Sequence, residues 1–371
     1  MKKLTDICDI QYGYAFDSKC FTEDSSYPQL VRIRDVKKGY SETYYSGDYP
    51  EEYILSEGDL LVGMDGEFNI ARWKCSGALL NQRVCRLTAK VGTNEEYLRF
   101  AMSKSLKEIE QRTAFVTVKH LSAKELNKLE LDVPELSKQD KIADTLNRLE
   151  RVIEARKEEL EKLDNLIKAR FVEMFGDVQH EEKYKGIQLR ELCTTMSGGT
   201  PSTKFPEYYE GDIPWISTVS LGPNYIDGTT AKGYITQEAV DNSATKLIPA
   251  GNILFGTRVG VGKSSLNNVD ICTNQDIVAI VGIDESKFNR LFIKHVLDAY
   301  QPYYDSIKKG ATILGITGDD LKDTLIPNVP IEIQIEFEKF VNQVDKSKVA
   351  VQKALTETQL LFDSLMQQYF G

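Results

Sequence analysis

The chain has 371 residues, of which 41% are hydrophobic and 27% charged, and its formal net charge is −10 at pH 7. This length suits two or more domains, and the composition is typical of a folded globular protein rather than a disordered one or one coated in positive potential. No apolar run approaches the ~18 residues of a membrane-spanning helix, and the start of the chain lacks a signal peptide, so we expect a cytoplasmic protein.

The first segment, 1–134, is predicted to be a mixed α/β globule with short strands. Apolar runs bounded by Gly, Pro and Asp predict strands at 30–36, 59–64 and 83–88. One amphipathic helix is predicted near 95–112, with Tyr97, Leu98, Met102, Leu106 and Ile109 on its inner face. A last short strand then leads to Val133-Pro134.

A long helix is predicted over the second segment, 135–176. A seven-residue frame that begins at Ile142 places apolar side chains on one seam, which only Arg156 and Arg170 interrupt. The seam consists of Ile142, Leu146, Leu149, Ile153, Leu160, Leu163, Ile167 and Met174.

The third segment, 177–330, repeats the first. A hydrophilic stretch from Asp177 to Gly186 links the two halves. Strands are predicted at 214–219, 252–256 and 277–281, and a helix near 285–300. A last short strand again precedes a Val-Pro pair, at Val329-Pro330.

The fourth segment, 331–371, is a second copy of the long helix, shifted by 195 residues. Lys348 and Thr358 interrupt its seam, which consists of Phe337, Val341, Val344, Val351, Leu355, Phe362, Leu365 and Tyr369. Each copy carries a Gln shortly after its Val-Pro pair, at Gln139 and Gln334, and ends on Phe-Gly.

The repeat also extends through the globules. Gly58-Asp-Leu-Leu-Val-Gly63 matches Gly251-Asn-Ile-Leu-Phe-Gly256, and Asn81-Gln82 matches Asn274-Gln275, both with an offset of 193. We therefore predict an α+β protein, in which two mixed α/β globules alternate with two long helices. The helices are expected to pair as an antiparallel coiled coil, which gives the chain an internal pseudo-twofold repeat.

Two equal helices that pair head to tail would hold the two globules at a fixed separation. About 38 residues at a rise of ~1.5 Å make a rod of roughly 57 Å. Symmetric DNA readers place their half-sites about one helical turn, ~34 to 36 Å, apart. The pattern therefore favours a protein that binds a DNA target in two parts. The paired helices would set the distance between the two globules.

The residues also carry a family resemblance that covers the whole chain. Gly13-Tyr-Ala-Phe-Asp-Ser-Lys and Gly198-Gly-Thr-Pro-Ser follow the start of each half, and a Val-Pro-x-x-x-x-Gln pattern at 133–139 opens the first long helix. In their order and duplication, these features resemble the specificity (S) subunit of type I restriction-modification systems. In that family two target-recognition domains alternate with two conserved helical regions.

The resemblance implies a non-catalytic subunit that binds double-stranded DNA, with one part of the target read by each globule. It implies two methyltransferase subunits docked through the helices, and translocating endonuclease subunits for cleavage. S-adenosylmethionine and ATP are expected on those partners, and no cofactor on this chain. Some relatives carry a conserved element ahead of the first globule, and none is expected here because the sequence starts directly at that globule.

Candidate DNA-reading residues lie on loops next to the aligned strands. Arg can form two hydrogen bonds with guanine and Asn can form two with adenine, whereas Asp can accept a hydrogen bond from cytosine. The candidates in the first globule are Arg32, Arg34, Asp65, Asn69, Arg72 and Lys119. Those in the second are Lys204, Thr257, Arg258, Lys263, Lys309 and Thr312. For each of them a solvated surface role is an equal alternative, and Arg34-Asp35 could be a local ion pair.

The net charge limits how strongly these candidates can bind DNA. Phosphate contacts supply much of DNA affinity, yet the chain as a whole is acidic. Stretches without any acid remain at 68–94 and at 242–269, and both contain several Lys and Arg. We expect the isolated chain to discriminate only weakly between DNA sequences. Its partners are expected to supply many of the phosphate contacts.

Other functions are less compatible with the sequence. Gly256 to Ser264 is similar to a phosphate-binding Walker loop, but it has five residues where that motif has four, and no amphipathic helix follows. The six cysteines show no CxxC spacing, which argues against a zinc site. The main alternative is a coiled-coil scaffold whose globules bind protein and have no DNA specificity, and nucleotide hydrolysis is a distant third.

Overall fold

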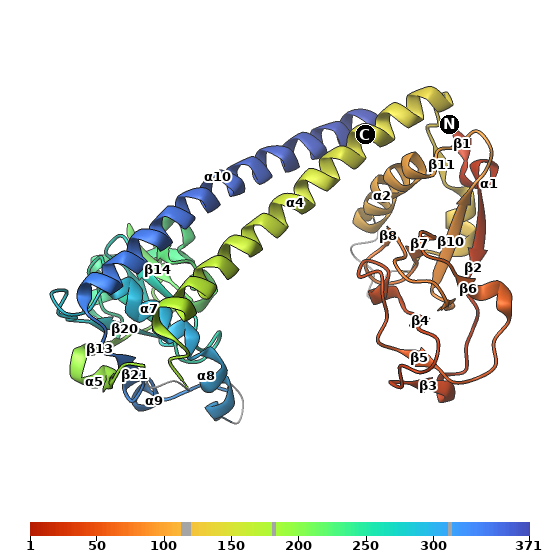
Figure 1. Cartoon of the computed structure of the whole chain (residues 1–371). Coiled ribbons are helices and arrows are strands. Elements are labelled where there is room, and N and C mark those ends of the chain that lie inside the picture. The colour runs from red at the N-terminus through yellow and green to blue at the C-terminus, as the bar shows by residue number, and fades with distance from the viewer. Residues whose placement is uncertain (113–119, 180–182, 311–313) are drawn as a thin grey trace. The chain divides into compact units, whose positions relative to one another are not determined.

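The computed structural model describes residues 1–112, 120–179, 183–310 and 314–371 (Figure 1). The chain divides into two compact units: unit 1 comprises Met1–Glu158 with Gln352–Gly371, and unit 2 comprises Glu159–Val351. Each unit contains one globule and parts of both long helices, α4 (Leu136–Phe175) and α10 (Ile331–Phe370). The predicted fold class, α+β with a duplicated globule and helix, is confirmed.

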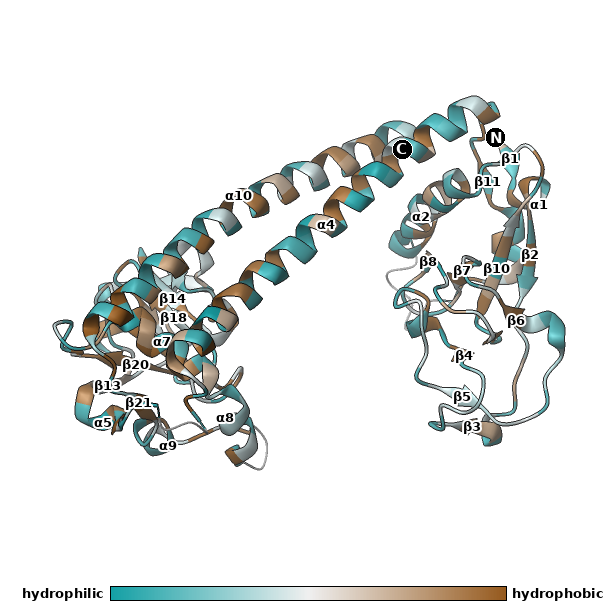
Figure 2. Ribbon diagram, viewed as in Figure 1, coloured by the Kyte–Doolittle hydropathy of each residue, from teal (hydrophilic) through white to brown (hydrophobic). Residues whose placement is uncertain are grey.

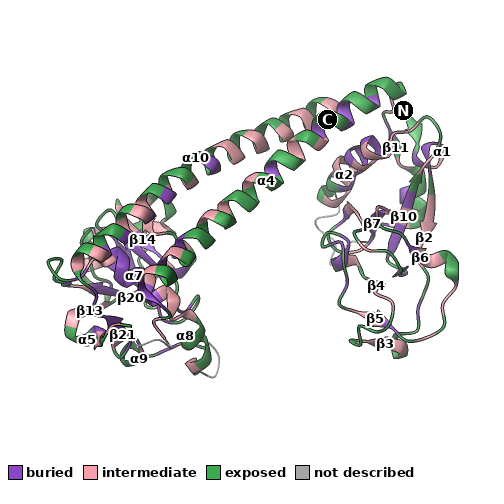
Figure 3. Ribbon diagram, viewed as in Figure 1, coloured by how far each residue is buried: buried purple, intermediate pink, exposed green. Residues whose placement is uncertain are grey.

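The main sheet of unit 1 is antiparallel, with strand order β2-β10-β7-β8. Its strands are β2 (Cys8–Tyr12), β7 (Leu60–Gly63), β8 (Asn69–Arg72) and β10 (Val84–Ala89). Helix α2 (Glu95–Arg112) packs against this sheet and buries Leu98 and Met102, as its sequence pattern predicts. Figure 3 shows buried residues concentrated along β7 and β10.

Smaller sheets complete the first globule. One has the order β4-β9-β6, and β3 pairs with β5 and β1 with β11. These strands are β1 (Lys2–Lys3), β3 (Phe21–Thr22), β4 (Leu30–Val31), β5 (Tyr44–Tyr45), β6 (Ile54–Leu55), β9 (Ala78–Leu80) and β11 (Glu130–Leu131). The short helices are α1 (Leu4–Ile7) and α3 (Ala123–Lys128), with single 3₁₀ turns at η1 (Ser18–Cys20), η2 (Ile33–Asp35) and η3 (Glu51–Tyr53).

Unit 2 has a similar arrangement, with one additional strand in its main sheet and, among its described strands, no counterpart of the β3–β5 pair. Its main sheet has the order β13-β20-β17-β18-β15, its second sheet β16-β14-β19, and β12 pairs with β21. The strands are β12 (Gly186–Gln188), β13 (Thr194–Ser197), β14 (Ile213–Ile216), β15 (Tyr225–Ile226), β16 (Gly233–Ile235), β17 (Ile253–Gly256), β18 (Ser264–Asn267), β19 (Cys272–Thr273), β20 (Ile277–Val281) and β21 (Leu325–Pro327).

The helices of the second globule match those of the first. Helix α5 (Leu189–Leu192) corresponds to α1, α7 (Arg290–Ala299) to α2, and α9 (Gly318–Lys322) to α3. The remaining helices and turns are α6 (Gln237–Asp241), α8 (Gln301–Ile307), η4 (Pro206–Tyr209), η5 (Thr218–Ser220) and η6 (Gly228–Thr230). Helix α7 begins later than the predicted 285, because the Asn289 side chain accepts a hydrogen bond from the Phe292 amide and caps the helix there.

The strands predicted at 30–36 and 214–219 are shorter than expected, since each turns into a 3₁₀ helix. In unit 1 the buried Asp35 carboxylate accepts hydrogen bonds from the Arg32 amide (3.0 Å) and the Ser41 hydroxyl (3.0 Å). The carboxylate thereby stabilises a turn in place of an extended strand.

The long helices complete the core of each unit. In unit 2, Phe171 and Phe175 near the end of α4 contact Phe337 near the start of α10. In unit 1, Leu146 near the start of α4 belongs to the same core as Phe362 near the end of α10. Each unit thus combines an early part of one helix with a late part of the other, which is the antiparallel sense.

All the predicted seam residues of both helices are buried or partly buried, and the remaining faces are mainly hydrophilic, with some exposed apolar side chains such as Leu166 and Leu361 (Figure 2). Two of the polar residues that interrupt the seam form ion pairs across it. The Arg170 guanidinium lies 3.0 Å from the Glu336 carboxylate, and the Lys348 ammonium lies 2.5 Å from the Asp164 carboxylate. Arg170 and Lys348 therefore both have partners within unit 2.

The duplicated Gln ties each globule to the start of its long helix. The Gln334 side chain accepts from the Asn289 amide (2.8 Å) and donates to the Lys287 carbonyl (3.1 Å) and the Val329 carbonyl (2.7 Å). Gln139 makes the same three bonds in unit 1, from the Asn94 amide and to the Gly92 and Pro134 carbonyls. Both side chains are buried.

None of the helices in the described part of the chain is long and apolar enough to cross a membrane.

Candidate nucleic-acid interface

In unit 1 a corner forms where the chain leaves β7 and meets the start of β10. The Met64 amide donates to the Arg83 carbonyl (3.0 Å), and the Leu121 amide donates to the Met64 carbonyl (2.7 Å). These backbone bonds place Asp65, Arg83 and His120 beside one another. The Arg83 Nε lies 3.3 Å from an Asp65 oxygen, and the His120 ring contacts the other oxygen of the same carboxylate.

Unit 2 contains the equivalent corner, where the chain leaves β17 and meets the start of β20. The Thr257 amide donates to the Asp276 carbonyl (2.8 Å), and the Ile316 amide donates to the Thr257 carbonyl (2.8 Å). Here Arg258 Nη1 lies 3.7 Å from an Asp276 oxygen. We define these two places as the unit 1 corner (Asp65, Arg83 and His120) and the unit 2 corner (Thr257, Arg258 and Asp276).

Other predicted residues of the first globule lie near the unit 1 corner. Arg32 and Arg34 are exposed and flank or belong to η2, which lies against Gly63 at the end of β7. Arg34 forms an ion pair with the adjacent Asp35 (3.7 Å). The Asn69 side chain is buried, and its Oδ1 has no hydrogen-bond partner within the described structure.

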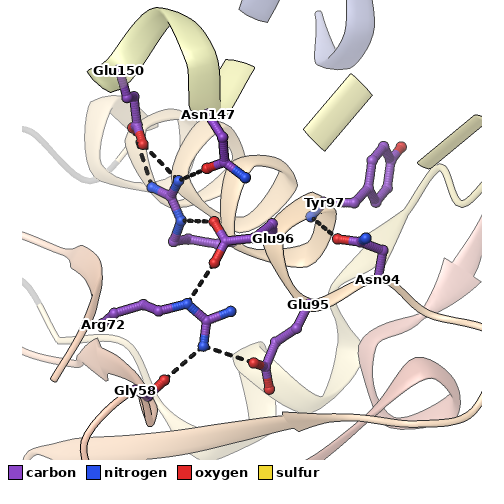
Figure 4. Close-up of polar contacts among 9 residues, drawn as sticks. Gly58, Arg72, Asn94, Glu95, Glu96, Tyr97, Asn147 and Glu150 are labelled. Atoms are coloured by element: carbon purple, nitrogen blue, oxygen red, sulfur yellow. Dashed lines mark hydrogen bonds and ion pairs between the residues drawn. The ribbon is translucent and has the colours of Figure 1, made fainter. Parts of the chain in front are cut away.

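Arg72 lies at the opposite end of β8, where its guanidinium already has protein partners (Figure 4). It donates to the Gly58 carbonyl (2.6 Å) and to the carboxylates of Glu95 (2.7 Å) and Glu96 (2.5 Å). Burial alone would lower the pKa of Arg72, but the two carboxylates outweigh it and raise that pKa. These contacts favour a structural role for Arg72 over a role in reading DNA.

The same network extends to the long helix. Arg99 on α2 donates to Glu96 (2.8 Å) and to Glu150 on α4 (2.6 Å). Burial would raise the pKa of Glu96, yet Arg99 and Arg72 together hold it below its usual value. Within unit 1 the network therefore joins the sheet, α2 and the first half of α4.

The predicted residues of the second globule fall into two groups. Arg258 and Lys263 are exposed on the β17–β18 loop, whereas Thr257 is buried and donates to the Asp276 carbonyl (3.1 Å). The exposed Lys309 is paired through its backbone with Gly315, which in turn adjoins Thr257. Lys204 is exposed in the turn before η4, where its backbone amide donates to the Ser202 hydroxyl (3.3 Å), and this contact does not connect it to the corner.

Two further candidates, Lys119 and Thr312, lie outside the described residues. The corners also contain three residues that we did not single out from the sequence: Arg83, His120 and Asp276. The offset of 193 could have identified two of them, because it aligns Arg83 with Asp276 and Asp65 with Arg258.

The glycine-rich stretch from Gly256 to Ser264 is the loop of a β-hairpin. It connects β17 to β18, which pair antiparallel, and no helix follows it. A phosphate-binding loop of the Walker type instead opens a helix whose N-terminus faces the phosphate. This geometry argues against nucleotide binding at the loop.

A cavity of about 560 Å³ in unit 2 lies between the last turns of α4 and helix α7. Four of the charged groups that line it are paired, since Lys294 contacts Asp298 (2.7 Å) and Lys348 contacts Asp164. Burial holds the pKa of His295 well below its usual value, with smaller contributions from Lys294 and Lys348, so this imidazole is neutral. Among the described residues, no group of His, Cys, Asp and Glu is placed to hold a metal ion.

Comparison with known proteins identifies related sequences and folds. The family model for the type I restriction modification DNA specificity domain matches residues 1–165 and 181–359. The specificity subunit of the type I restriction enzyme EcoBI from Escherichia coli is 39% identical over 166 residues, which make up 44% of this chain and 35% of that protein. The MjaIX specificity subunit from Methanocaldococcus jannaschii is 30% identical over 141 residues, 38% of this chain and 33% of that protein.

These alignments span about a third of the curated relatives' length. Solved structures match over nearly the whole chain. The S subunit of the type I restriction-modification system from M. genitalium has a TM-score of 0.59 at 14% identity and covers 100% of this chain and 95% of its own. A structure described for complex assembly and conformational transition of the type I R-M system has a TM-score of 0.56 at 19% identity, with 99% and 96% covered. At these identities the likeness shows the fold.

Proposed function

The chain belongs to the family of type I restriction-modification DNA specificity domains, and on that premise we propose that it is the non-catalytic subunit that selects a DNA sequence. In this proposal each globule reads one half of a bipartite target. The observation that carries it is the duplication of the corner, because the main sheets of the two globules share a four-strand order and each presents an exposed arginine at the corresponding corner. Two equivalent readers on one chain suit a target in two parts.

The partners and the compartment follow from the same proposal. Methyltransferase subunits bind S-adenosylmethionine, translocating endonuclease subunits use ATP, and this chain holds neither. All six cysteines are free thiols, which suits the reducing conditions of the cytoplasm. With a net charge of −10, the chain depends on its partners for much of the phosphate contact.

Methylome sequencing tests the proposal. The chain is produced together with the methyltransferase subunits of its own system in a host that has no methylation of its own, and the modified bases are located in the host genome. We expect methylation within a motif of two short specific parts separated by a spacer of any sequence, and none when the chain is omitted. Methylation without a motif, or within a single uninterrupted motif, would contradict the bipartite reading.

The same complex separates this function from the alternative of a coiled-coil scaffold with protein-binding globules. A DNA reader binds duplex containing its motif more tightly than scrambled duplex, and the affinity falls steeply as salt rises. A scaffold without DNA specificity would bind both duplexes alike.

The long helices provide a surface for the methyltransferases. Leu166 on α4 in unit 2 and Leu361 on α10 in unit 1 occupy equivalent positions of the repeat, with an offset of 195. Both stay exposed, by 47% and 50%, although they are large apolar side chains on otherwise amphipathic helices. We propose that each one packs against one methyltransferase subunit.

Leu361→Glu is expected to reduce the number of methyltransferase subunits that co-purify with the chain from two to one, and Leu166→Glu to do the same. Loss of one buried leucine contact weakens association about 10- to 150-fold. Mass photometry of the purified complex measures the stoichiometry. Val91→Glu, at a fully exposed loop position outside the helices, is the matched control and should leave two subunits bound. Unchanged stoichiometry in both helix variants would disprove this docking surface.

A further inference from the structure

The two corners contain the same ion pair with its members exchanged. Under the offset of 193, Asp65 takes the position of Arg258, and Arg83 takes the position of Asp276. In unit 1 the acid follows β7 and the arginine precedes β10, whereas in unit 2 the arginine follows β17 and the acid precedes β20. The contact is present in both, at 3.3 Å and 3.7 Å. Each corner thus contains one guanidinium and one carboxylate, and their order along the chain is opposite in the two units.

Burial distinguishes the two members of each pair. The acids are largely covered, with side-chain exposures of 22% for Asp65 and 15% for Asp276. The arginines are half exposed, at 51% for Arg83 and 55% for Arg258. Ion pairs with this much exposure contribute little to stability, so stability alone gives little reason for the pair to occur twice.

Each acid is itself held in place by a third residue. The His120 ring contacts one oxygen of Asp65, and the Asn274 side chain donates to Asp276 (3.1 Å). A fixed carboxylate restricts the guanidinium that it contacts. Arginine has five N–H donors in a planar fork, so the donors that do not face the acid remain available on the exposed side.

We propose that Arg83 and Arg258 are the specificity-determining residues of the two half-sites, each donating to O6 and N7 of a guanine in the major groove. Asp65 and Asp276 are positioning residues that orient these arginines. This inference rests on the proposed function, since it identifies the side chains through which each globule reads its half of the target. Each half-site therefore contains a G·C pair recognised by one arginine.

The neighbouring pair of Arg34 and Asp35 is the nearest competitor, but it occurs only once. Val31 lies opposite Leu80 as Ile216 lies opposite Thr273, which places Val219 and Ser220 at the corresponding positions of unit 2. An ion pair that occurs in one globule alone gives no reason to expect an equivalent base-contacting arginine in both globules.

The test uses the methyltransferase complex and compares methylation of the wild-type motif with methylation of sites that carry one changed base pair. Arg83→Gln is expected to reduce discrimination at one G·C pair of one half-site about 5- to 150-fold and to leave the other half-site unchanged. Arg258→Gln should do the converse, so each variant is the internal control of the other. Arg190→Gln, which removes an ion-paired arginine outside the corner, should change neither half.

Two further variants separate recognition from charge and from folding. Arg83→Lys keeps the charge but loses the rigid planar fork of donors, so it should relax the same base pair less than Arg83→Gln does. Asp65→Asn should weaken preference at that base pair only, whereas a merely structural role would weaken methylation at every site. Glutamine variants that lower methylation without changing any base preference would overturn the inference. If the wild-type complex itself has no bipartite motif, the proposed function fails instead.

Discussion

Phe337→Ala is expected to lower the free energy of unfolding of unit 2 by about 3–5 kcal/mol, the usual cost of removing a buried aromatic side chain. Phe337 is fully buried at the start of α10. Its ring contacts those of Phe171 (5.5 Å between centroids), Phe175 (5.4 Å) and His295 (5.2 Å). The substitution therefore leaves a cavity at the place where both long helices meet the second globule.

The two tryptophans of the chain permit this measurement within one unit. Trp73 lies in unit 1 and Trp215 in unit 2, so a Trp73→Phe background leaves one fluorophore that reports on unit 2. Urea unfolding followed by that signal should show the loss for Phe337→Ala. Phe205→Ala, at a half-exposed ring, is the control and should change the free energy by less than about 0.5 kcal/mol. An equal effect of both substitutions would show that the helix does not complete the core.

Gln334→Ala should destabilise unit 2 by about 3 kcal/mol or more, because it leaves one amide and two carbonyl groups of the backbone without partners. Each buried polar group that loses its hydrogen bond costs about 1–3 kcal/mol. Gln139→Ala removes the same three bonds in unit 1 and should destabilise that unit to a similar extent.

The paired design makes the outcome specific. Fluorescence from Trp215 should respond to Gln334→Ala, and fluorescence from Trp73, in a Trp215→Phe background, should respond to Gln139→Ala. Gln343→Ala, an exposed glutamine on the same helix as Gln334, controls for the substitution itself. If both Gln→Ala substitutions lowered the free energy of unfolding by less than about 1 kcal/mol, water would have replaced the hydrogen bonds of the glutamine side chains.

The sequence predicts the overall fold well because duplication and helical periodicity are properties of the chain itself. The seven-residue frame identifies the inward face of both long helices, and the offset of 193 aligns β7 with β17 and β10 with β20. The frame does not identify Phe171 and Phe175, which lie off the seam. They are buried by α7 and by Phe337, and such contacts depend on tertiary packing.

The candidate site was harder to predict, because ion pairs join residues that are distant in sequence. In the sequence, Arg72 lies in the stretch 68–94, which contains no acidic residue. In the structure, β8 places Arg72 beside Glu95 and Glu96 at the start of α2. Arg83 meets Asp65 only through the register that pairs Gly63 with Val84. A one-residue change of that register would place different side chains at the corner.

The division of the chain into units has a consequence for synthesis. Unit 2 is a continuous stretch, Glu159–Val351, whereas unit 1 needs both Met1–Glu158 and Gln352–Gly371. Phe362, Leu365 and Phe370 pack against the core of the first globule, yet a ribosome adds them only after it has completed the whole of unit 2. Unit 2 can therefore fold before unit 1 has received its last helical turns. This order is the reverse of the usual one, in which the N-terminal domain folds first during synthesis.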